Sequence, residues 1–238
     1  MEELAERIAA ARIDGGELGD APALPLERGY AVQDLVAARL GPAAGWKVGA
    51  TSAGAQRFLQ VTEPIRGRVP AAGVVRSGAR VPLPGDRAGE AEPEVLFRLA
   101  RDVGSGEDPA AAVAAAHLGI EVNRPSRPDA LALGAGFIVA DNAAHAALVV
   151  GPEIPMSALD WPAEVRVALS RNGGPASEGD AAQVLGHPLD ALRWLAGAVP
   201  LRAGEWVATG AMARACPFAP GDRVLADFGA LGVVEVRR

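Results

Sequence analysis

Residues 91–97 read Ala-Glu-Pro-Glu-Val-Leu-Phe, and this stretch decides how the surrounding chain folds. On a helix Glu92 and Glu94 would lie on opposite sides, and Pro93 would disrupt the helix. On a strand, residues two positions apart project from the same face. The stretch therefore predicts a strand that carries two neighbouring carboxylates. Pro93 has no backbone N–H to donate to a neighbouring strand. We therefore expect this end of the strand to lie at a sheet edge or just outside the paired region.

Short apolar runs punctuated by glycine and proline continue on both sides and predict a β-rich body. The expected strands are Trp46–Ala50, Arg68–Val75, Glu94–Leu99, Leu118–Val122, Ala146–Val150, Glu164–Ser170, Trp206–Thr209, Arg223–Phe228 and Gly232–Val236. Helical spacing of apolar residues predicts helices over residues 2–12 and 27–40, and further helices over Pro109–Ala116 and Pro188–Val199. Helices first, followed mainly by strands, indicate an α+β fold. We expect an N-terminal helical cap, residues 1–44, and a β-rich catalytic body, residues 45–238.

Composition excludes several classes of protein. The 238 residues carry a formal charge of −6, which argues against a nucleic-acid partner. Cys216 is the only cysteine, so the chain has no internal disulfide and no cysteine-rich zinc site. No secretory signal follows Met1, and no apolar run approaches the ~20 residues of a membrane span, so we expect a cytoplasmic protein with no membrane partner. Nucleotide-binding and nucleophile-elbow motifs are absent, and the three histidines lack metal-ligand spacing.

The acidic residues point to a metal. Two adjacent glutamates repel each other unless a cation or a proton separates them, and oxygen-only ligation suits Mg²⁺ or Mn²⁺. Glu121 is a third acid, within the apolar stretch of residues 117–123, where an unpaired charge is uncommon. The alternative is that Glu92 and Glu94 are solvated at a strand end while Glu121 pairs with Arg124 or Arg127.

Lys47 is the only lysine among 23 basic residues, in a short apolar strand between glycines. A buried lysine can have a lowered pKa and exchange a proton, which arginine does not do. The alternative is a strand lysine whose stem packs on Trp46 while its head reaches water.

Four further polar residues are candidates for substrate binding: Asp141, Asn142, Thr209 and His187. Asp and Asn more often fix a loop by bonding to local backbone groups. Thr209 and the glycine after it end a strand where a hydroxyl and exposed amides can hold a substrate carboxylate, or they simply form a strand-to-turn transition. His187 precedes Pro188 and can instead cap the helix that begins there.

Several segments, taken in order, carry a family resemblance: Gly45–Ser52, Glu92–Glu94, Gly119–Val122, Ala140–Ala143, Leu185–Leu189 and Pro220–Gly229. The chain resembles the 2-keto-4-pentenoate hydratase and 4-oxalocrotonate decarboxylase family, within the fumarylacetoacetate hydrolase superfamily. The resemblance implies a mixed β-roll core with an N-terminal helical part, a homo-oligomer, and a role in the catabolism of aromatic compounds. It also implies a divalent cation, usually Mg²⁺, on Glu92, Glu94 and Glu121, with the active-site lysine at Lys47.

Three positions depart from the family pattern and keep several reactions open. Ile65 stands where many hydratases have an aspartate, although the decarboxylase branch also has isoleucine there; Ala144 and Ala211 replace hydroxyl-bearing residues. We expect a metal-dependent lyase of hydratase type that acts on a short 2-hydroxydienoate or 2-oxo acid through a metal-stabilised enolate. The alternatives are a 2-oxo acid decarboxylase, a C–C bond hydrolase of the same superfamily, and a catalytically degenerate protein that binds a metal and a 2-oxo acid.

Overall fold

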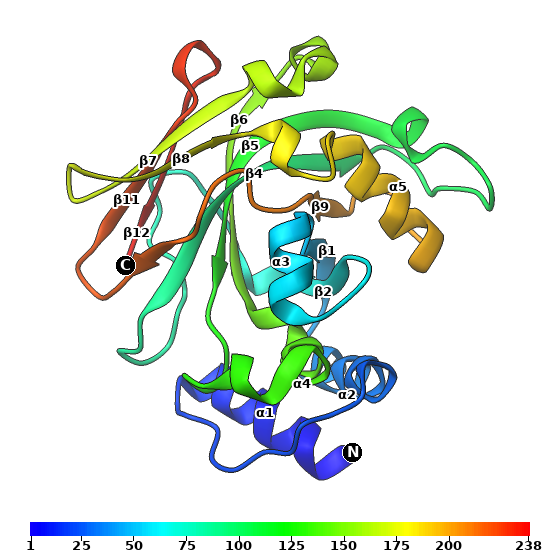
Figure 1. The fold of residues 1–238 in the computed structure, drawn as a ribbon, viewed down its shortest axis with the longest axis vertical. Helices are drawn as coiled ribbons and strands as arrows, with labels where there is room; N and C mark the ends of the chain where they lie inside the picture. Colours follow the sequence, from blue (N-terminus) through cyan, green and yellow to red (C-terminus); the bar gives the residue numbers. More distant parts are fainter.

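The strands of the computed structural model, which describes residues 1–238, form two sheets that pack against each other across a shared core, and the larger sheet is strongly curled (Figure 1). The strands are β1 Ala43–Gly49, β2 Ile65–Pro70, β3 Val74–Arg76, β4 Gly89–Leu99, β5 Val113–Asn123, β6 His145–Ile154, β7 Arg166–Arg171, β8 Gly174–Asp180, β9 Trp206–Ala208, β10 Cys216–Phe218, β11 Arg223–Asp227 and β12 Val233–Arg237. The helices are α1 Glu2–Asp14, α2 Leu26–Arg39, α3 Ala53–Leu59, α4 Gly134–Ala140 and α5 Pro188–Ala198.

The larger sheet has the order β2-β1-β9-β4-β5-β6-β3, with β10 paired to β4, and the smaller has the order β12-β11-β7-β8. Strands β4, β5 and β6 are antiparallel neighbours, whereas β1 with β9 and β3 with β6 are parallel. A mixed sheet of this kind, flanked by helices, confirms the α+β prediction. None of the helices has the length and apolar character that a membrane crossing requires.

Alternation along β4 decides where the polar side chains go. Val95 and Phe97 belong to the main core, which lies between the two sheets. Glu92, Glu94 and Leu96 occupy the opposite face of the same strand because side chains alternate along it. On that face Leu96 packs with a second, small apolar cluster from β2, β6 and β9. The glutamates are therefore on the concave side of the large sheet, away from the main core.

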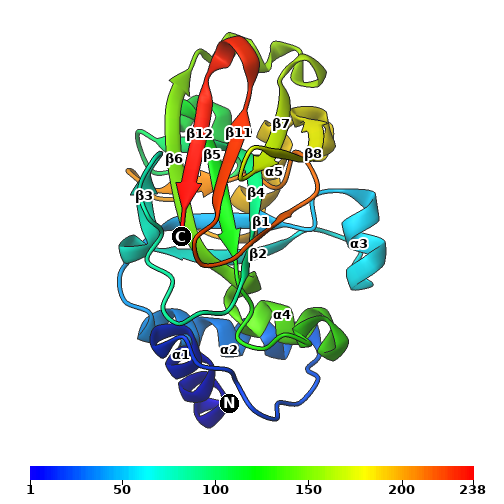
Figure 2. The same cartoon turned by 90° about the vertical axis from the view of Figure 1, so that its left-hand side faces the viewer.

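Helices α1, α2 and α4 form a layer at one end of the sheets (Figure 2). Ile8, Val36 and Phe137, one from each helix, share a separate buried apolar cluster. Because α4 lies in the chain well after residue 44, the helical layer is not built from the N-terminal segment alone. The division of the chain between residues 44 and 45 stays a prediction.

The helix predicted over Pro109–Ala116 is wrong. Pro109–Ala112 forms one 3₁₀ turn, and β5 begins at Val113, opposite Leu99 of β4. Tertiary pairing with β4 overrides the helical propensity of the alanines, which is only a few tenths of a kcal/mol per residue, about the size of ordinary propensity differences. Helices α3 and α4 and strands β8 and β10 were not predicted, and the single strand predicted over Arg68–Val75 is divided between β2 and β3.

The edge position predicted for Pro93 is also wrong. Pro93 lies in the middle of β4, opposite Ile120 of β5. On the side away from β5, Pro93 faces a gap between two short strands. One is β9, which ends opposite Leu96, and the other is β10, which begins opposite Ala91. In that gap the Pro93 carbonyl accepts a hydrogen bond from Met212 of the connecting loop. The missing amide donor is tolerated because no strand pairs with Pro93 on the side of β4 that faces away from β5.

Candidate metal centre

Three glutamates meet on the concave face of β4 and β5. Glu92 lies directly opposite Glu121 in the antiparallel pair, and Glu94 follows on the same face. One carboxylate oxygen from each residue lies within 4.8 Å of the others. Glu94 and Glu121 are fully buried, and Glu92 is half-buried. The structure thus brings these three side chains together, and their role as metal ligands stays a prediction.

Each carboxylate has one oxygen held by a protein donor. The three bonds are Asn123 Nδ2 to Glu92 Oε2 at 2.8 Å, the Gly210 amide to Glu94 Oε2 at 2.9 Å, and His145 Nδ1 to Glu121 Oε1 at 2.6 Å. The remaining oxygen of Glu94 is buried without a hydrogen-bond partner, and the remaining oxygen of Glu121 faces only the Lys47 ammonium group. Buried carboxylate oxygens without a partner are costly, and hard divalent cations take such oxygens as ligands. The donor set therefore fits a divalent cation bound through one oxygen of each glutamate.

Lys47 reaches the same place from β1. Its Nζ lies 3.2 Å from Glu121 Oε2, and its side chain is 5% exposed. The head does not reach water, so the alternative of a solvated strand lysine is wrong. Burial lowers the pKa of Lys47, but the three nearby carboxylates outweigh burial and raise this pKa above its ordinary value. The metal-free site thus holds an ammonium group, rather than the lysine of lowered pKa that the sequence suggested.

The three carboxylates differ in pKa and therefore in protonation state. Burial, followed by repulsion from Glu121, raises the pKa of Glu92 to about 7 and that of Glu94 well above its ordinary value. Burial also disfavours the Glu121 anion, but Lys47 and His145 outweigh it and hold the pKa of Glu121 at about 2. In the metal-free site, protons therefore remain on Glu92 and Glu94 at pH values where exposed glutamates are ionised.

We expect metal binding to release protons near neutral pH. Because Glu92 and Glu94 bind protons more tightly in the folded chain than in the unfolded chain, the metal-free protein loses stability as pH rises through about 7. For the same reason Mn²⁺ affinity rises with pH, by about tenfold per pH unit for each displaced proton. Calorimetric titration of Mn²⁺ in two buffers of different ionisation heat measures this release. If Mn²⁺ binding at about pH 6.5 releases no proton, the assignment of Glu92 and Glu94 as metal ligands is contradicted.

His145 was missed by the sequence analysis, which found no metal-ligand spacing among the histidines. Burial lowers the pKa of His145, more than the Glu121 contact raises it. The neutral ring donates from Nδ1 to Glu121, which leaves the other Glu121 oxygen directed towards Lys47. Because the register between β5 and β6 is interrupted twice, strand alternation alone does not predict that His145 meets Glu121.

Replacing His145 with alanine should weaken Mn²⁺ binding about 10–100-fold because one Glu121 oxygen loses the donor that orients it. His145→Asn keeps a short donor near the Nδ1 position and should restore most of the affinity. Equilibrium titration with Mn²⁺ separates the two variants. The matched control is His187→Asn, since asparagine is also a good helix cap. Equal Mn²⁺ affinity in the alanine and asparagine variants contradicts the positioning role of His145.

Thr209 and Gly210 border the carboxylates through their backbone. The Thr209 hydroxyl donates to the Val95 carbonyl at 2.8 Å, and the next amide holds Glu94. Gly210 has a φ of 119°, and a Cβ there would lie 2.3 Å from Thr51 Oγ1, so only glycine fits. This strand end is therefore a fixed part of the site's wall, and contact of Thr209 with substrate stays a prediction.

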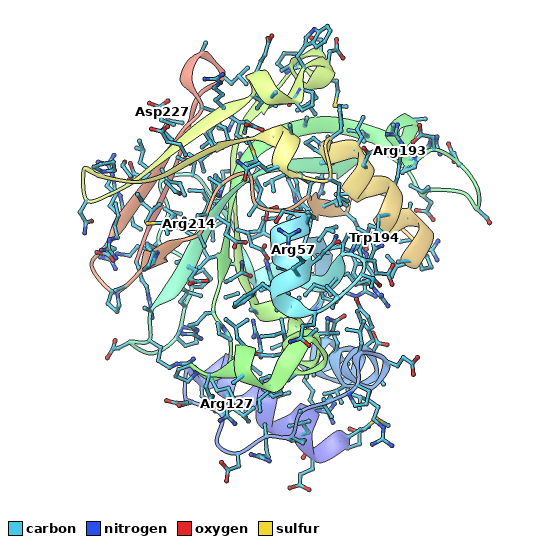
Figure 3. The ribbon with its side chains drawn as sticks, in the orientation of Figure 1. Arg57, Arg127, Arg193, Trp194, Arg214 and Asp227 are labelled. Carbon is cyan, nitrogen blue, oxygen red and sulfur yellow. The ribbon has the colours of Figure 1, made fainter.

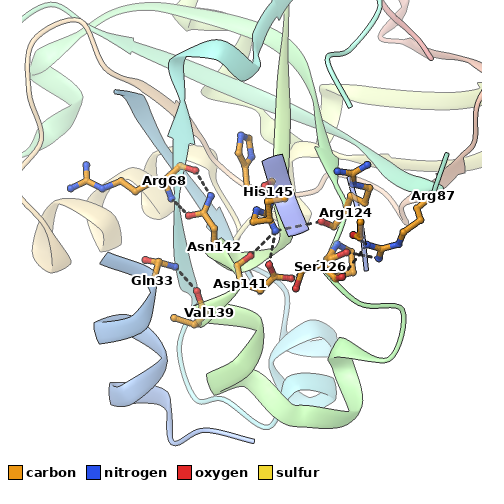
Figure 4. Close-up of polar contacts among 12 residues, drawn as sticks. Gln33, Arg68, Arg87, Arg124, Ser126, Val139, Asp141, Asn142 and His145 are labelled. Atoms are coloured by element: carbon orange, nitrogen blue, oxygen red, sulfur yellow. Dashed lines mark hydrogen bonds and ion pairs between the residues drawn. The ribbon is translucent and has the colours of Figure 1, made fainter. Parts of the chain in front are cut away.

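Asp141, Asn142 and His187 make other contacts. Asp141 accepts hydrogen bonds from the Ser126 amide and Arg12, and Asn142 bonds to both the amide and the carbonyl of Arg68 (Figure 4). His187 caps α5 by accepting from the Leu189 amide. The structure brings together Lys47, the three glutamates and the Thr209 turn. In contrast, the side chains of Asp141 and Asn142 fix loops, and that of His187 caps a helix. Their role in substrate binding stays a prediction.

The alternative pairing of Glu121 with Arg124 or Arg127 is wrong. Arg124 donates to the Pro84 carbonyl. Arg127 pairs with Asp129 and lies beside the helical layer (Figure 3). Both arginines come after β5 has ended, so neither reaches the concave face.

Ile65 presents an apolar wall close to Lys47. Ile65 is buried at the start of β2, directly opposite Gly49 of β1. A Cβ at Gly49 would lie 3.3 Å from both Ile65 Cγ1 and Lys47 Nζ. No carboxyl group therefore stands at position 65 to share proton transfer with Lys47.

Fold and site together define a class of protein: a curled mixed sheet that carries a cluster of three carboxylates able to hold a divalent cation. The chain belongs to the fumarylacetoacetate hydrolase family, since the model of the Fumarylacetoacetate (FAA) hydrolase C-terminal domain matches residues 47–237. This membership confirms the family resemblance and the fold that it implies.

Two relatives and one solved structure show what the chain is similar to. It is 32% identical to the 2-hydroxyhexa-2,4-dienoate hydratase of Comamonas testosteroni, over 81% of this chain and 77% of that protein. It is 32% identical to the 2-keto-4-pentenoate hydratase of Paraburkholderia xenovorans, over 90% of this chain and 84% of that protein. The 4-oxalocrotonate decarboxylase from Pseudomonas putida G7, complexed with magnesium and adipate, superposes with a TM-score of 0.85 at 25% identity, over 99% of this chain and 96% of that one.

Proposed function

We propose that the protein is a divalent-metal-dependent lyase of hydratase type that acts on a short 2-hydroxydienoic or 2-oxo acid. The observation that carries the proposal is the group of three glutamates, in which one Glu94 oxygen is buried without a partner and one Glu121 oxygen lies 3.2 Å from the Nζ of the only lysine. The hydratase names of the two relatives support the substrate class.

We propose that Glu92, Glu94 and Glu121 hold the metal and that Mg²⁺ or Mn²⁺ is the ion, because all ligands are carboxylate oxygens. The magnesium in the similar decarboxylase structure supports the same choice. When bound, the cation supplies a Lewis acid for the negative charge that develops on the C2 oxygen of the substrate. The buried surroundings of Glu94 and Glu121 keep water from weakening this charge interaction.

Lys47 carries the proton at Nζ. In hydration of a 2-hydroxydienoate, the 2-hydroxyl loses a proton and the far carbon of the diene gains one, which gives an unsaturated 2-oxo acid. Water then adds across the remaining double bond, with hydroxyl at C4 and hydrogen at C3. A lysine ammonium within reach of the carboxylate cluster is positioned to give and recover the first of these protons.

Decarboxylation is a second candidate, favoured by one observation in the site. Ile65 offers no acid–base group beside Lys47, so the water-addition step lacks a second proton carrier on that side. In a decarboxylation, the electrons of the broken C–C bond move to the C2 oxygen as carbon dioxide leaves, and Lys47 returns a single proton to the carbon. The overall fold of a similar decarboxylase structure is consistent with this candidate.

An absorbance assay separates these candidates. The protein is incubated with Mg²⁺ and 2-hydroxypenta-2,4-dienoate, and loss of the diene absorbance is followed. A second assay with 4-oxalocrotonate measures carbon dioxide release. Turnover of the dienoate identifies the hydratase, and carbon dioxide from 4-oxalocrotonate alone identifies the decarboxylase. No turnover of either compound, with Mn²⁺ binding retained, supports the degenerate binding protein instead.

Two further predictions from the sequence concern assembly and location. We propose a homo-oligomer in solution, which light scattering of the purified protein tests directly. The cytoplasmic location stays a prediction.

A further inference from the structure

A cavity of about 150 Å³ lies beside His145, and none of the three glutamates lines it. Arg12 from the end of α1, Arg124 from the end of β5, and His145 supply its polar lining. No aspartate or glutamate lines it. Its apolar walls come from Leu40, Pro70, Pro82, Leu83 and Pro84. We call this space the arginine cavity.

Arg124 is the unusual residue of the arginine cavity. It is only 4% exposed, yet its guanidinium has no carboxylate partner and donates only to the Pro84 carbonyl. A guanidinium has five N–H donors, so most of the Arg124 donors remain available. Taking an unpaired charge out of water costs several kcal/mol, about the penalty found for a buried ion that lacks its partner.

Neighbouring arginines increase the positive charge. Burial, followed by the charges of Arg12, Arg238 and Arg87, lowers the pKa of Arg124 to about 10. Arg12 is neutralised by Asp141, but Arg87 and Arg238 donate only to backbone carbonyls. Figure 4 shows Arg87 and Arg124 close together beside Ser126.

Part of this cluster has a structural purpose. Arg87 bonds to Gly16 and Ser126, which ties the segment after α1 to the segment after β5. Carbonyl oxygens satisfy the hydrogen bonds of such arginines but carry no net charge to balance them. The structural role therefore explains the bonds of Arg87. It does not explain why Arg124 faces a cavity with no carboxylate in contact, since Asp141, the carboxylate that acts on Arg124, is already paired with Arg12.

We propose that the arginine cavity is a binding site for a small oxyanion, held by the free N–H groups of Arg124 with Arg12 at its side. A tetrahedral oxyanion or a single carboxylate group is of suitable size, since the cavity has room for several water molecules at about 30 Å³ of liquid volume each. The planar guanidinium matches both kinds of anion through paired hydrogen bonds.

Calorimetry and thermal unfolding of the full chain test this site. Inorganic phosphate is one arm, succinate is the second, and chloride at equal ionic strength is the reference. We expect one of the two oxyanions to raise the unfolding temperature above that measured in chloride. Stabilisation by phosphate indicates a tetrahedral oxyanion, and stabilisation by succinate indicates a carboxylate. Arg124→Met should weaken that anion at least tenfold, while its stability without anion stays equal or increases because a buried positive charge is removed.

Three controls make the result specific. Arg166→Met removes an exposed arginine at the start of β7 and should keep the wild-type response to the anion. Glu94→Gln, which alters the carboxylate cluster, should also keep it, and this distinguishes the arginine cavity from anion binding at a metal. If the methionine variant does not fold, Arg124→Lys replaces it. The lysine variant should keep part of the affinity for the oxyanion because it keeps the positive charge at position 124. An equal response to chloride, or an unchanged response in Arg124→Met, overturns the proposal.

Discussion

Glu94→Gln should abolish metal binding and lyase activity together while the fold persists. The Gly210 amide donates to one oxygen of Glu94, and the other oxygen is buried without a partner. In glutamine the amide oxygen takes the position beside Gly210, so its NH₂ group faces the place where a cation needs an oxygen. We expect Mn²⁺ affinity to fall by more than about 100-fold, beyond the effect of losing an outer hydrogen bond. Calorimetric titration with Mn²⁺ and the diene absorbance assay measure both losses.

The metal-free protein gives a second readout of the same substitution. Burial raises the pKa of Glu94 because the ionised form is poorly solvated there. A neutral glutamine avoids this cost, so the metal-free variant should unfold at a higher temperature than wild type at mildly alkaline pH. Glu90→Gln is the matched control, since Glu90 is exposed on the same strand. Wild-type Mn²⁺ affinity in Glu94→Gln contradicts the metal assignment.

The strand that carries Glu92 and Glu94 could be predicted from the sequence. Alternation and the helix-breaking Pro93 were sufficient to place both carboxylates on one face, and the structure confirms that placement. The partnership with Glu121 depends on the β4–β5 register, which is a long-range property. The sequence supplied it only through the family resemblance, and the competing pairing with Arg124 or Arg127 could not be rejected from spacing.

The residues that were missed depend on contacts between segments far apart in the chain. His145 meets Glu121 across a pair of strands with two register shifts, and a shift of one residue would turn its side chain to the other face. Asn123 and Gly210 reach Glu92 and Glu94 from different segments. The error over Pro109–Ala116 has the same origin, because local propensity carries no information about a strand partner.

Lys47→Met should lower kcat about 10²–10⁴-fold, the usual range for loss of a positioned proton carrier. Methionine is of similar length and is apolar, so it suits a side chain that is 5% exposed. Mn²⁺ affinity should stay the same or increase, because a positive charge 3.2 Å from Glu121 is removed. Loss of turnover with metal binding retained is the opposite of the Glu94→Gln pattern, and the same two assays reveal the difference.

Lys47→Arg distinguishes two roles of Lys47: transfer of a proton at Nζ and compensation of the Glu121 negative charge. Arginine keeps a positive charge beside Glu121, but it stays protonated at any pH the protein survives. If Lys47 only balanced the carboxylates, the arginine variant would turn over substrate at close to the wild-type rate. If Lys47 transfers a proton at Nζ, the arginine variant is as inactive as the methionine variant. Normal turnover in Lys47→Arg therefore removes the acid–base role and leaves the lysine as a counter-charge for Glu121.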